Sequence, residues 1–279
     1  MPVAKPTIDR RTASGTRPQR PEPVDAISAV IDRLAATRQA VLPDGRIRDI
    51  NAFAVSNAAG ALLERAAAAA PAGAVVEVGC ASGLSTLHMA RGRLASGKQP
   101  DHSHYHAIDP KQTTHWDSIG RMHLTQAGID GLVTFHEQPA HAVLPRLVAS
   151  HCHVGMAFID GWHMLDYVMV EAFYVDLMLD MGGIIAIHDM WMPGLQHFAC
   201  FWLANLPYEP VTVAMDSKGR PCLSNDGCES ANREVGDLAG VPRMFREAVA
   251  PFVDESVLLM RKRDIDRRQW DEFHAYSAV

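Results

Sequence analysis

The sequence predicts an α/β fold, a doubly wound and mostly parallel sheet with helices on both faces and antiparallel strands near the C-terminus. Two observations lead to this prediction. Short apolar runs alternate with helical patterns between Ala74 and Asp189, and strands that alternate with helices form parallel sheets through right-handed crossovers. A glycine-rich turn also follows the first apolar run, at the position where open α/β sheets bind ligands.

Composition limits the class of protein. The chain has 279 residues, with 26 Lys and Arg against 32 Asp and Glu, and a net charge of −6. This slight acidity argues against binding nucleic acid through phosphate contacts. No apolar run approaches the roughly 20 residues of a membrane-spanning helix, and the N-terminus lacks the apolar core of a signal peptide. We therefore expect a cytoplasmic protein without nucleic-acid or membrane partners, whose five irregularly spaced cysteines stay reduced.

The chain divides into an arm and one domain. Residues 1–25 are rich in proline and basic side chains and are predicted to be a disordered arm. Residues 26–279 are predicted to form a single domain, with N-terminal helices in 26–72, a cofactor-binding core in 73–215 and a C-terminal elaboration in 216–279. The helical patterns of the first part are Val24–Ala40 and Ile50–Ala70.

The core is predicted to contain five buried strands: Ala74–Val78, Tyr105–Asp109, Leu132–His136, Met156–Asp160 and Ile184–Asp189. Four helical patterns lie between them: Leu84–Leu94, Trp116–Ala127, Ala140–Ala149 and Met164–Met181. In the last helix Leu165, Val168, Ala172, Val175 and Leu179 share one face. Gly182-Gly183 is expected to end that helix as a C-cap.

Beyond Met192 the alternation weakens. Gly194–Leu206 is predicted to be a helix and Val211–Ala214 a strand, and the turn sequence Asp216–Arg220 predicts a hairpin into Cys222-Leu223. A polar, partly helical insertion is expected in 224–250, followed by a last strand in 256–261 and a charged tail.

The first candidate site is the turn after the first strand, Glu77-Val78-Gly79-Cys80-Ala81-Ser82-Gly83-Leu84-Ser85-Thr86. Its glycines let the backbone approach a ligand, and the N–H groups of the helix that follows offer donors to a polar or anionic group. Ala81 stands where a dinucleotide-binding turn has its second glycine, which counts against NAD(P), and Gly83 is not followed by the Lys-Ser/Thr pair of a P-loop. Asp109 ends the second strand, where a carboxylate can accept hydrogen bonds from ribose hydroxyls.

Val76–Gly83 resembles the first motif of class I S-adenosylmethionine-dependent methyltransferases, and Ile108-Asp109-Pro110 resembles their second. The resemblance implies a Rossmann-like domain that binds S-adenosylmethionine. In such a domain the glycine turn lies alongside the methionine part, Asp109 binds the ribose, and Gln138-Pro139-Ala140 contacts adenine. Ser56 resembles the helix segment that closes over the cofactor in the O-methyltransferase branch. The cofactor-binding residues expected on this basis are Ser56, Glu77, Gly79, Ala81, Ser82, Gly83, Ser85, Asp109, Gln138 and Asp160.

The second candidate site lies at the ends of the fourth and fifth strands, where Asp160 and Asp189 stand. Neighbouring strands are about 4.8 Å apart, so the two carboxylates should lie close together. They repel each other unless a proton or a cation lies between them. Oxygen ligands of this kind suit Mg²⁺. A substrate hydroxyl bound to that ion becomes more acidic, and His163 can take its proton.

Asp160-Gly161-Trp162-His163 with His188-Asp189 resembles the metal-dependent O-methyltransferase branch that includes macrolide-sugar (macrocin-type) and cephalosporin-cluster methyltransferases. This resemblance implies that Asp160 and Asp189 are metal ligands and that His163 is the catalytic base beside Asp160. His188 stands where many relatives have an acidic or amide ligand, and it is the third ligand we expect. Three alternatives stay open: His163 as a helix cap, His188 as a structural residue, and Asp189 as a substrate-positioning acid without metal.

We therefore expect an S-adenosylmethionine-dependent methyltransferase that uses Mg²⁺ to methylate a hydroxyl on a small molecule of sugar or natural-product type. A homo-oligomer is compatible with this expectation. The alternative functions are a metal-independent N- or C-methyltransferase and a non-catalytic ligand-binding module. An NAD(P) oxidoreductase is disfavoured by Ala81.

Overall fold

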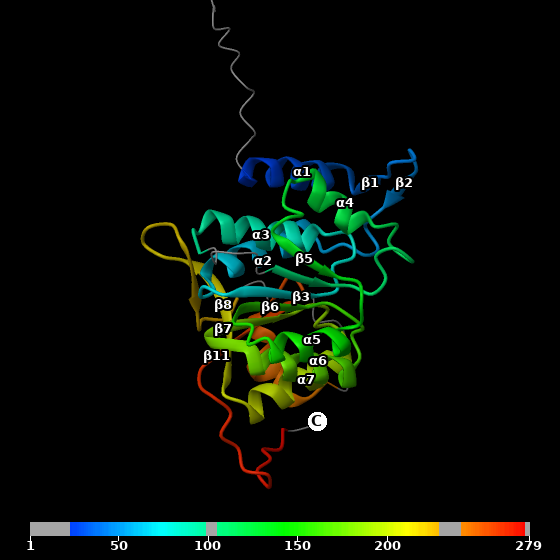
Figure 1. Cartoon of the computed structure of the whole chain (residues 1–279). Helices are drawn as coiled ribbons and strands as arrows, with labels where there is room; N and C mark the ends of the chain where they lie inside the picture. The colour runs from blue at the N-terminus through cyan, green and yellow to red at the C-terminus, as the bar shows by residue number, and fades with distance from the viewer. Residues whose placement is uncertain (1–22, 99–104, 229–240, 277–279) are drawn as a thin grey trace, which may run out of the picture.

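The structure is a computed structural model that describes residues 23–98, 105–228 and 241–276. Its centre is one sheet with the strand order β5-β4-β3-β6-β7-β11-β8-β9 (Figure 1). The first five run parallel, and β11, β8 and β9 are each antiparallel to their neighbours. The strands are β3 (Ala74–Val78), β4 (Tyr105–Ile108), β5 (Val133–His136), β6 (Val154–Ile159), β7 (Leu179–Ile187), β8 (Tyr208–Met215), β9 (Pro221–Ser224) and β11 (Val257–Lys262), with β10 (Val253–Asp254) beside β11.

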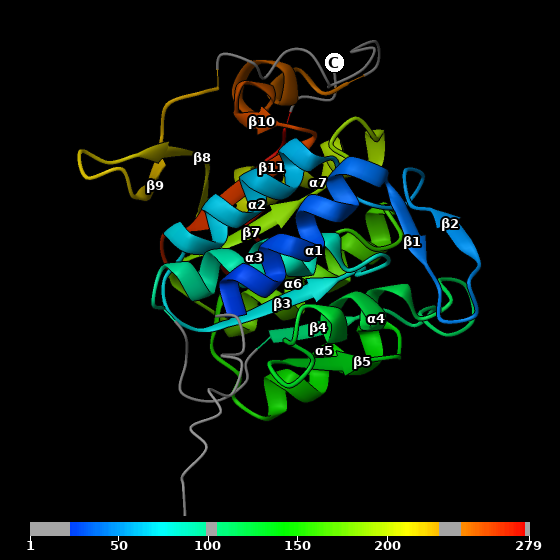
Figure 2. The ribbon, with the colours of Figure 1, turned by 90° about the horizontal axis from the view of Figure 1, so that it is seen from above.

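Helices cover both faces of this sheet (Figures 1 and 2). One face carries α1 (Pro23–Thr37), α2 (Asn57–Ala69), α3 (Leu84–Ala95) and α4 (Ile119–Gln126), and the other carries α5 (Ala140–Ala149), α6 (Leu165–Met178) and α7 (Pro193–Asn205). Each face has its own apolar core, because successive side chains of a strand point to opposite sides: Val75 packs in the first core and Val76 in the second. The parallel strands are thus buried on both faces, which explains their continuous apolar sequences. The predicted fold class is confirmed.

The N-terminal part differs from the prediction. A hairpin of β1 (Gln39–Val41) and β2 (Ile47–Asp49) occupies a region with no predicted strand, and α2 begins at Asn57 rather than at Ile50. The Ser56 hydroxyl caps α2 by accepting a hydrogen bond from the N–H of Ala59 at 2.9 Å. Helix α1 begins at Pro23, so residues 23–25 of the predicted arm are helical. Residues 1–22 lie outside the described residues.

The expected cap at Gly182-Gly183 is wrong. Helix α6 ends at Met178, and β7 begins at the next residue. The register of β7 against β6 then shifts: Val154 pairs with Leu179, but Met156 pairs with Ile184. Gly182 has a φ of 78° within this irregularity, so the glycine pair accommodates extra residues in a strand instead of closing a helix.

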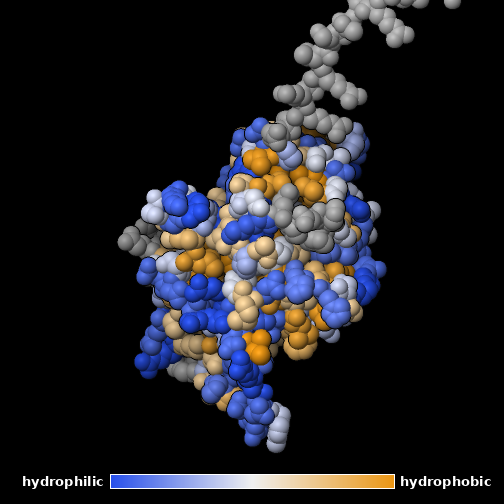
Figure 3. All heavy atoms as spheres, turned by 60° about the vertical axis from the view of Figure 1, so that its left-hand side comes forward, coloured by the Kyte–Doolittle hydropathy of each residue, from blue (hydrophilic) through white to orange (hydrophobic). Residues whose placement is uncertain are grey.

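The C-terminal part has the predicted hairpin and last strand. Strands β8 and β9 are joined by the Asp216–Arg220 turn and project from the body (Figure 2). The predicted insertion (224–250) contains the helical segment Phe245–Val249, and a second one, Ala250–Phe252, begins at its last residue. Residues 229–240 lie outside the described part. Strand β11 lies inside the sheet, between β7 and β8. The charged tail forms the hydrophilic projection at the lower end of Figure 3.

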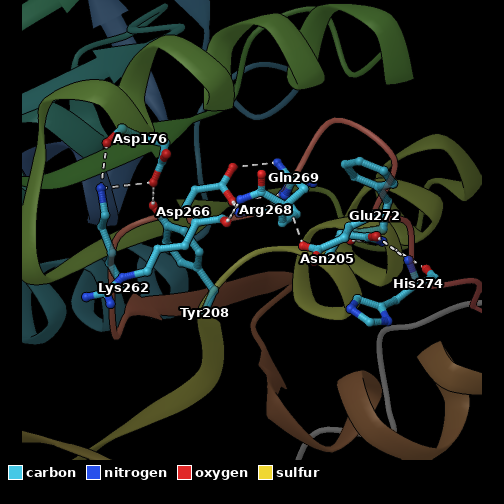
Figure 4. Close-up of polar contacts among 11 residues, drawn as sticks. Asp176, Asn205, Tyr208, Lys262, Asp266, Arg268, Gln269, Glu272 and His274 are labelled. Atoms are coloured by element: carbon cyan, nitrogen blue, oxygen red, sulfur yellow. Dashed lines mark hydrogen bonds and ion pairs between the residues drawn. The ribbon is translucent and has the colours of Figure 1, made fainter.

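The tail is tied to the body by polar contacts (Figure 4). Asn205, at the end of α7, exchanges hydrogen bonds with the backbone of His274, at 3.0 Å and 2.8 Å. None of the five cysteines, all of which lie in the described part of the chain, forms a disulfide. Among the described residues, no helix is long and apolar enough to cross a membrane.

Candidate active site

A cavity of about 540 Å³ opens at the carboxyl ends of β3, β4 and β6. From β3 the sheet is extended by β4 and β5 on one side and by β6 and β7 on the other, so the strand order reverses at β3. Open α/β sheets bind ligands at such a switch point. Among the predicted site residues, the cavity lining contains Gly79, Ala81, Asp109, Asp160 and His163.

The glycine turn holds the ends of two strands together. Gly79 has a φ of 88°, and a Cβ atom there would lie 2.1 Å from the carbonyl oxygen of Asp160. Gly83 has a φ of 77° and packs against the backbone of Gly120. Ala81 adopts a positive φ of 39° without being glycine. The turn therefore carries backbone strain beside the cavity, a property that clusters at functional sites.

Asp109 fixes this turn from the neighbouring strand. Its carboxylate is 4% exposed and accepts hydrogen bonds from the N–H groups of Ala81 and Lys111, at 2.8 Å and 2.9 Å, and from Gln112 Nε2 at 3.2 Å. Asp109 thus lines the cavity with an orientation that three donors hold in place.

Glu77 lies behind the cavity rather than in its lining. Its buried carboxyl group accepts hydrogen bonds from the hydroxyls of Ser85, Thr86 and Tyr105, at 2.5, 2.6 and 2.7 Å. Burial raises the pKa of Glu77 to about 7, although the three hydroxyls favour its ionised form. Glu77 and Ser85 therefore join β3, α3 and β4 beneath the glycine turn.

The remaining predicted cofactor residues have other neighbours. Besides its role as a cap, the Ser56 hydroxyl donates to Glu255 at 3.2 Å. Gln138 is hydrogen-bonded to Arg146, and the Ser82 carbonyl lies 2.7 Å from the His123 ring. None of these three side chains is in the cavity lining of the described chain, although Pro139 and Ala140 are. Their cofactor-binding role stays a prediction.

Two carboxylates and two imidazoles meet at the ends of β6 and β7. His163 Nε2 lies 3.0 Å from Asp160 Oδ1 and 3.2 Å from Asp189 Oδ2. His188 Nδ1 lies 3.0 Å from Asp160 Oδ1 and 3.5 Å from Asp189 Oδ1. Asp160, His163 and Asp189 each offer one possible ligand atom, and these atoms lie within 4.8 Å of one another. The predicted convergence of Asp160 and Asp189 is thus present.

Charge within this cluster moves the pKa values of its members. Burial alone would raise the pKa of Asp160, but the nearby imidazoles of His188 and His163 lower it overall. Burial would also lower the pKa of His163, but its hydrogen bond to Asp160 and the charges of Asp160 and Asp189 raise it overall. The cluster therefore favours the ionised carboxylate of Asp160 and the protonated imidazole of His163.

The cluster is also strained, and its two imidazoles face different surroundings. His163 and Asp189 have positive φ values of 57° and 55°, which cost energy in residues other than glycine. His163 lines the cavity, whereas His188 is outside the lining and its ring packs edge-on against Phe158. Of the two imidazoles, His163 is the one that a bound ligand can reach.

The lining includes residues that the sequence analysis did not single out as site residues: Lys111, Trp116, His141, Asp166, Tyr167 and Glu171. Lys111 Nζ lies 4.3 Å from the centre of the Trp162 ring, a cation–π contact between the loops that follow β4 and β6. A sequence signal did exist for Glu171. It follows Val168 by three residues and precedes Val175 by four, so it belongs to the buried face of α6.

Comparison with known proteins agrees with this geometry. Residues 76–190 match the family model described as a methyltransferase domain. No curated protein gives a significant match. Two solved structures share the fold at 16% identity: cofactor-bound Rv0187 from MTB, with a TM-score of 0.52 over 88% of this chain and 100% of that one, and the O-methyltransferase TomG from Streptomyces achromogenes in complex with SAM, with a TM-score of 0.50 over 86% and 90%.

Proposed function

We propose that the chain, whose residues 76–190 match the methyltransferase-domain family model, uses S-adenosylmethionine to methylate a hydroxyl group of a small molecule with the help of Mg²⁺. The observation that carries this proposal is the meeting of Asp160, His163 and Asp189, of which Asp160 and His163 line the cavity. We also propose the branch of macrocin-type and cephalosporin-cluster O-methyltransferases, on the resemblance of Asp160-Gly161-Trp162-His163 and His188-Asp189 to that branch.

The donor atoms of the cluster fit a divalent cation. Asp160 and Asp189 supply hard oxygen ligands, which Mg²⁺ prefers. His188, the third ligand that the sequence predicts, is outside the group of Asp160, His163 and Asp189, but its Nδ1 lies 3.0 Å from Asp160 Oδ1 and 3.5 Å from Asp189 Oδ1 and would supply a nitrogen ligand. When bound, the cation would neutralise both carboxylates and lower the pKa of a hydroxyl group that it contacts.

His163 is placed to accept the proton of the acceptor hydroxyl. It lines the cavity, and the hydrogen bond to Asp160 holds its ring in one orientation. In the reaction, the acceptor oxygen forms a bond to the sulfonium methyl carbon, the carbon–sulfur bond breaks, and the hydroxyl proton goes to the imidazole. The protein contributes orientation and a fixed electrostatic environment.

The same cavity supports binding of S-adenosylmethionine. The strained glycine turn and Asp109 border it on one side, and Pro139 and Ala140 border it at the start of α5. By the resemblance of the motifs, these positions would face the methionine part, the ribose and the adenine. TomG, whose fold is similar, is described in complex with SAM.

A first experiment separates cofactor binding from metal-assisted chemistry. Calorimetry should detect S-adenosylhomocysteine binding to the wild type, and absence of binding would contradict the methyltransferase proposal. Methyl transfer to hydroxylated small molecules should then be lost on chelation and on Asp189→Asn, while Asp130→Asn, an exposed acid outside the cavity lining, should leave it unchanged. Transfer to amines that resists chelation would instead support the metal-independent N-methyltransferase.

A further inference from the structure

Helix α6 carries apolar side chains on its outer side as well as on the side that packs against the sheet. Its inward face belongs to the second apolar core. On the outer side Val170, Phe173 and Leu177 are 42%, 55% and 56% exposed. They follow one another at spacings of three and four residues, so they form one stripe along the helix. A helix that is apolar all round is normally buried, whereas the outer side of α6 is open.

The apolar surface continues past both ends of the stripe. Asp166 is the only charged residue that is exposed between 162 and 181, because the other acids of this segment are buried or held in ion pairs. Met164 and Leu165 are exposed at the start of the helix. We call the main set of exposed apolar side chains the α6 face; it consists of Trp162, Tyr167, Val170, Phe173, Leu177 and Met181, which are 38–56% exposed.

Neither the cavity nor the ends of the chain account for this surface. Of the α6 face only Trp162, Tyr167 and Val170 line the cavity, so Phe173 and Leu177 lie beyond the reach of a ligand bound there. The described part of the C-terminal tail packs its aromatic rings against α7 instead. Helix α1, which follows the N-terminal arm, lies on the opposite face of the sheet (Figure 1). An occupant from another molecule therefore fits the α6 face better than the chain's own ends.

The size of the α6 face matches that of a protein interface. An aromatic side chain buries about 150–250 Å² and an aliphatic one about 60–120 Å². At the observed exposures, the α6 face together with Met164 and Leu165 presents roughly 350–650 Å² of apolar surface. An interface of standard size buries about 800 Å² on each partner, of which about 500 Å² is apolar. The α6 face thus supplies the apolar area that such an interface needs.

We propose that the α6 face binds the α6 face of a second copy of the chain, so that the protein is a homodimer. Interfaces between different proteins are about as polar as the rest of the surface, whereas homodimer interfaces are more apolar. The single exposed charge of the segment therefore favours a second copy, and a stripe at spacings of three and four residues can pack against itself across a two-fold axis.

The surroundings of the α6 face agree with this partner. The neighbouring helix α5 exposes His141 and Arg146, which provide the polar rim that surrounds the apolar centre of an interface. Because Tyr167 and Val170 also line the cavity, the partner copy lies beside the cavity wall that α6 forms. The inference goes beyond the proposed function and does not depend on it.

The test measures the oligomeric state of the full chain by sedimentation velocity over a dilution series. The wild type should be a dimer at about 10 µM, because interfaces of this size dissociate at micromolar concentrations or below. Phe173→Asp should raise the dissociation constant about 100-fold or more, since two carboxylates then enter the apolar centre of the contact. Ile47→Asp is the matched control, because Ile47 is 60% exposed on β2, outside the α6 face. This variant should remain a dimer.

Circular dichroism establishes that both variants fold. Should Phe173→Asp not fold, Leu177→Asp makes the same comparison one turn further along α6. A wild type that is monomeric at the stated concentration overturns the proposal and leaves the α6 face to a different occupant. A dimer that survives Phe173→Asp also overturns it, because the contact between the copies then lies elsewhere. Neither result bears on the proposed function, since methyl transfer is not part of the measurement.

Discussion

Gly79 and the backbone carbonyl of Asp160 are in such close contact that a Cβ atom on Gly79 would lie 2.1 Å from that oxygen. The backbone N–H of Asp160 also donates to Val78 at 2.8 Å, so the ends of β3 and β6 stay paired beyond the last strand residue. The glycine of the first motif therefore has a structural role in addition to any contact with a cofactor. It brings the turn of the first candidate site against the acid of the second.

Gly79→Ala should accordingly destabilise the protein by about 3 kcal/mol or more, because the methyl group meets backbone that cannot move aside and φ is positive. Gly128→Ala is the matched control, since Gly128 has a φ of 69° but no atom within 4 Å of the position that the new methyl group would take. It should cost about 1–2 kcal/mol from backbone strain alone. If chemical denaturation shows that Gly79→Ala and Gly128→Ala lose the same free energy of unfolding, the contact with Asp160 is unimportant.

The imidazoles of His163 and His188, which both lie beside Asp160 and Asp189, should have separable roles. His188→Gln should weaken Mg²⁺ or Mn²⁺ binding, measured by calorimetry, by about 10-fold or more, because it removes a nitrogen donor that lies within 3.5 Å of both carboxylates. His163→Gln should leave metal affinity within a few-fold and reduce kcat about 100-fold or more by removing the proton acceptor. The opposite pattern, with metal affinity lost only in His163→Gln, would make His163 the ligand.

Stability should depend on pH through Glu77. Its pKa is about 7 in the folded protein against 4.5 ordinarily, so the folded state binds the proton more tightly than the unfolded state. Its favourable contribution is complete below pH 4.5 and is lost as the pH rises through 7, by about 3 kcal/mol in total. Glu77→Gln should flatten this part of the curve of unfolding free energy against pH. An unchanged slope between pH 5 and 8 would exclude Glu77 as its source.

Much of the site followed from topology. Asp160 and Asp189 could be placed together because the doubly wound order makes the fourth and fifth strands neighbours, and β6 pairs with β7 as this order requires. The N-terminal hairpin was missed because strands of three residues give almost no periodic signal. Gly182-Gly183 was misassigned because a glycine with positive φ suits a helix end and a strand irregularity equally well.

Long-range pairing was harder to predict. The last strand was found, but not its place between β7 and β8, because antiparallel pairing with distant strands leaves no local mark in the sequence. The interactions of Ser56 and Glu77 were missed for the same reason. Ser56 contacts Glu255 from 199 positions away, and Tyr105 reaches Glu77 from the neighbouring strand.

The base of the C-terminal tail should depend on one buried ion pair. Lys262 Nζ lies 3.0 Å from Asp176 Oδ1 and donates to the Asp176 carbonyl at 2.7 Å, and the Tyr208 hydroxyl donates to the same carboxylate at 2.6 Å (Figure 4). The Lys262 and Asp176 side chains are only 8% and 14% exposed. Removing one partner leaves the other charge buried and unpaired, so Lys262→Met should cost about 3–5 kcal/mol.

The exposed pair Arg243–Glu247, with side chains 63% and 61% exposed, provides the control for this prediction. Arg243→Met should cost less than about 1 kcal/mol, because solvent screens that pair. Combining Lys262→Met with Asp176→Leu and Tyr208→Phe should cost less than Lys262→Met alone, since no buried charge or hydroxyl then lacks a partner. Urea denaturation of the full chain measures the free energy of unfolding of all three variants. A triple variant that is less stable than Lys262→Met would show that Lys262, Asp176 and Tyr208 stabilise the tail junction by more than their pairing with one another.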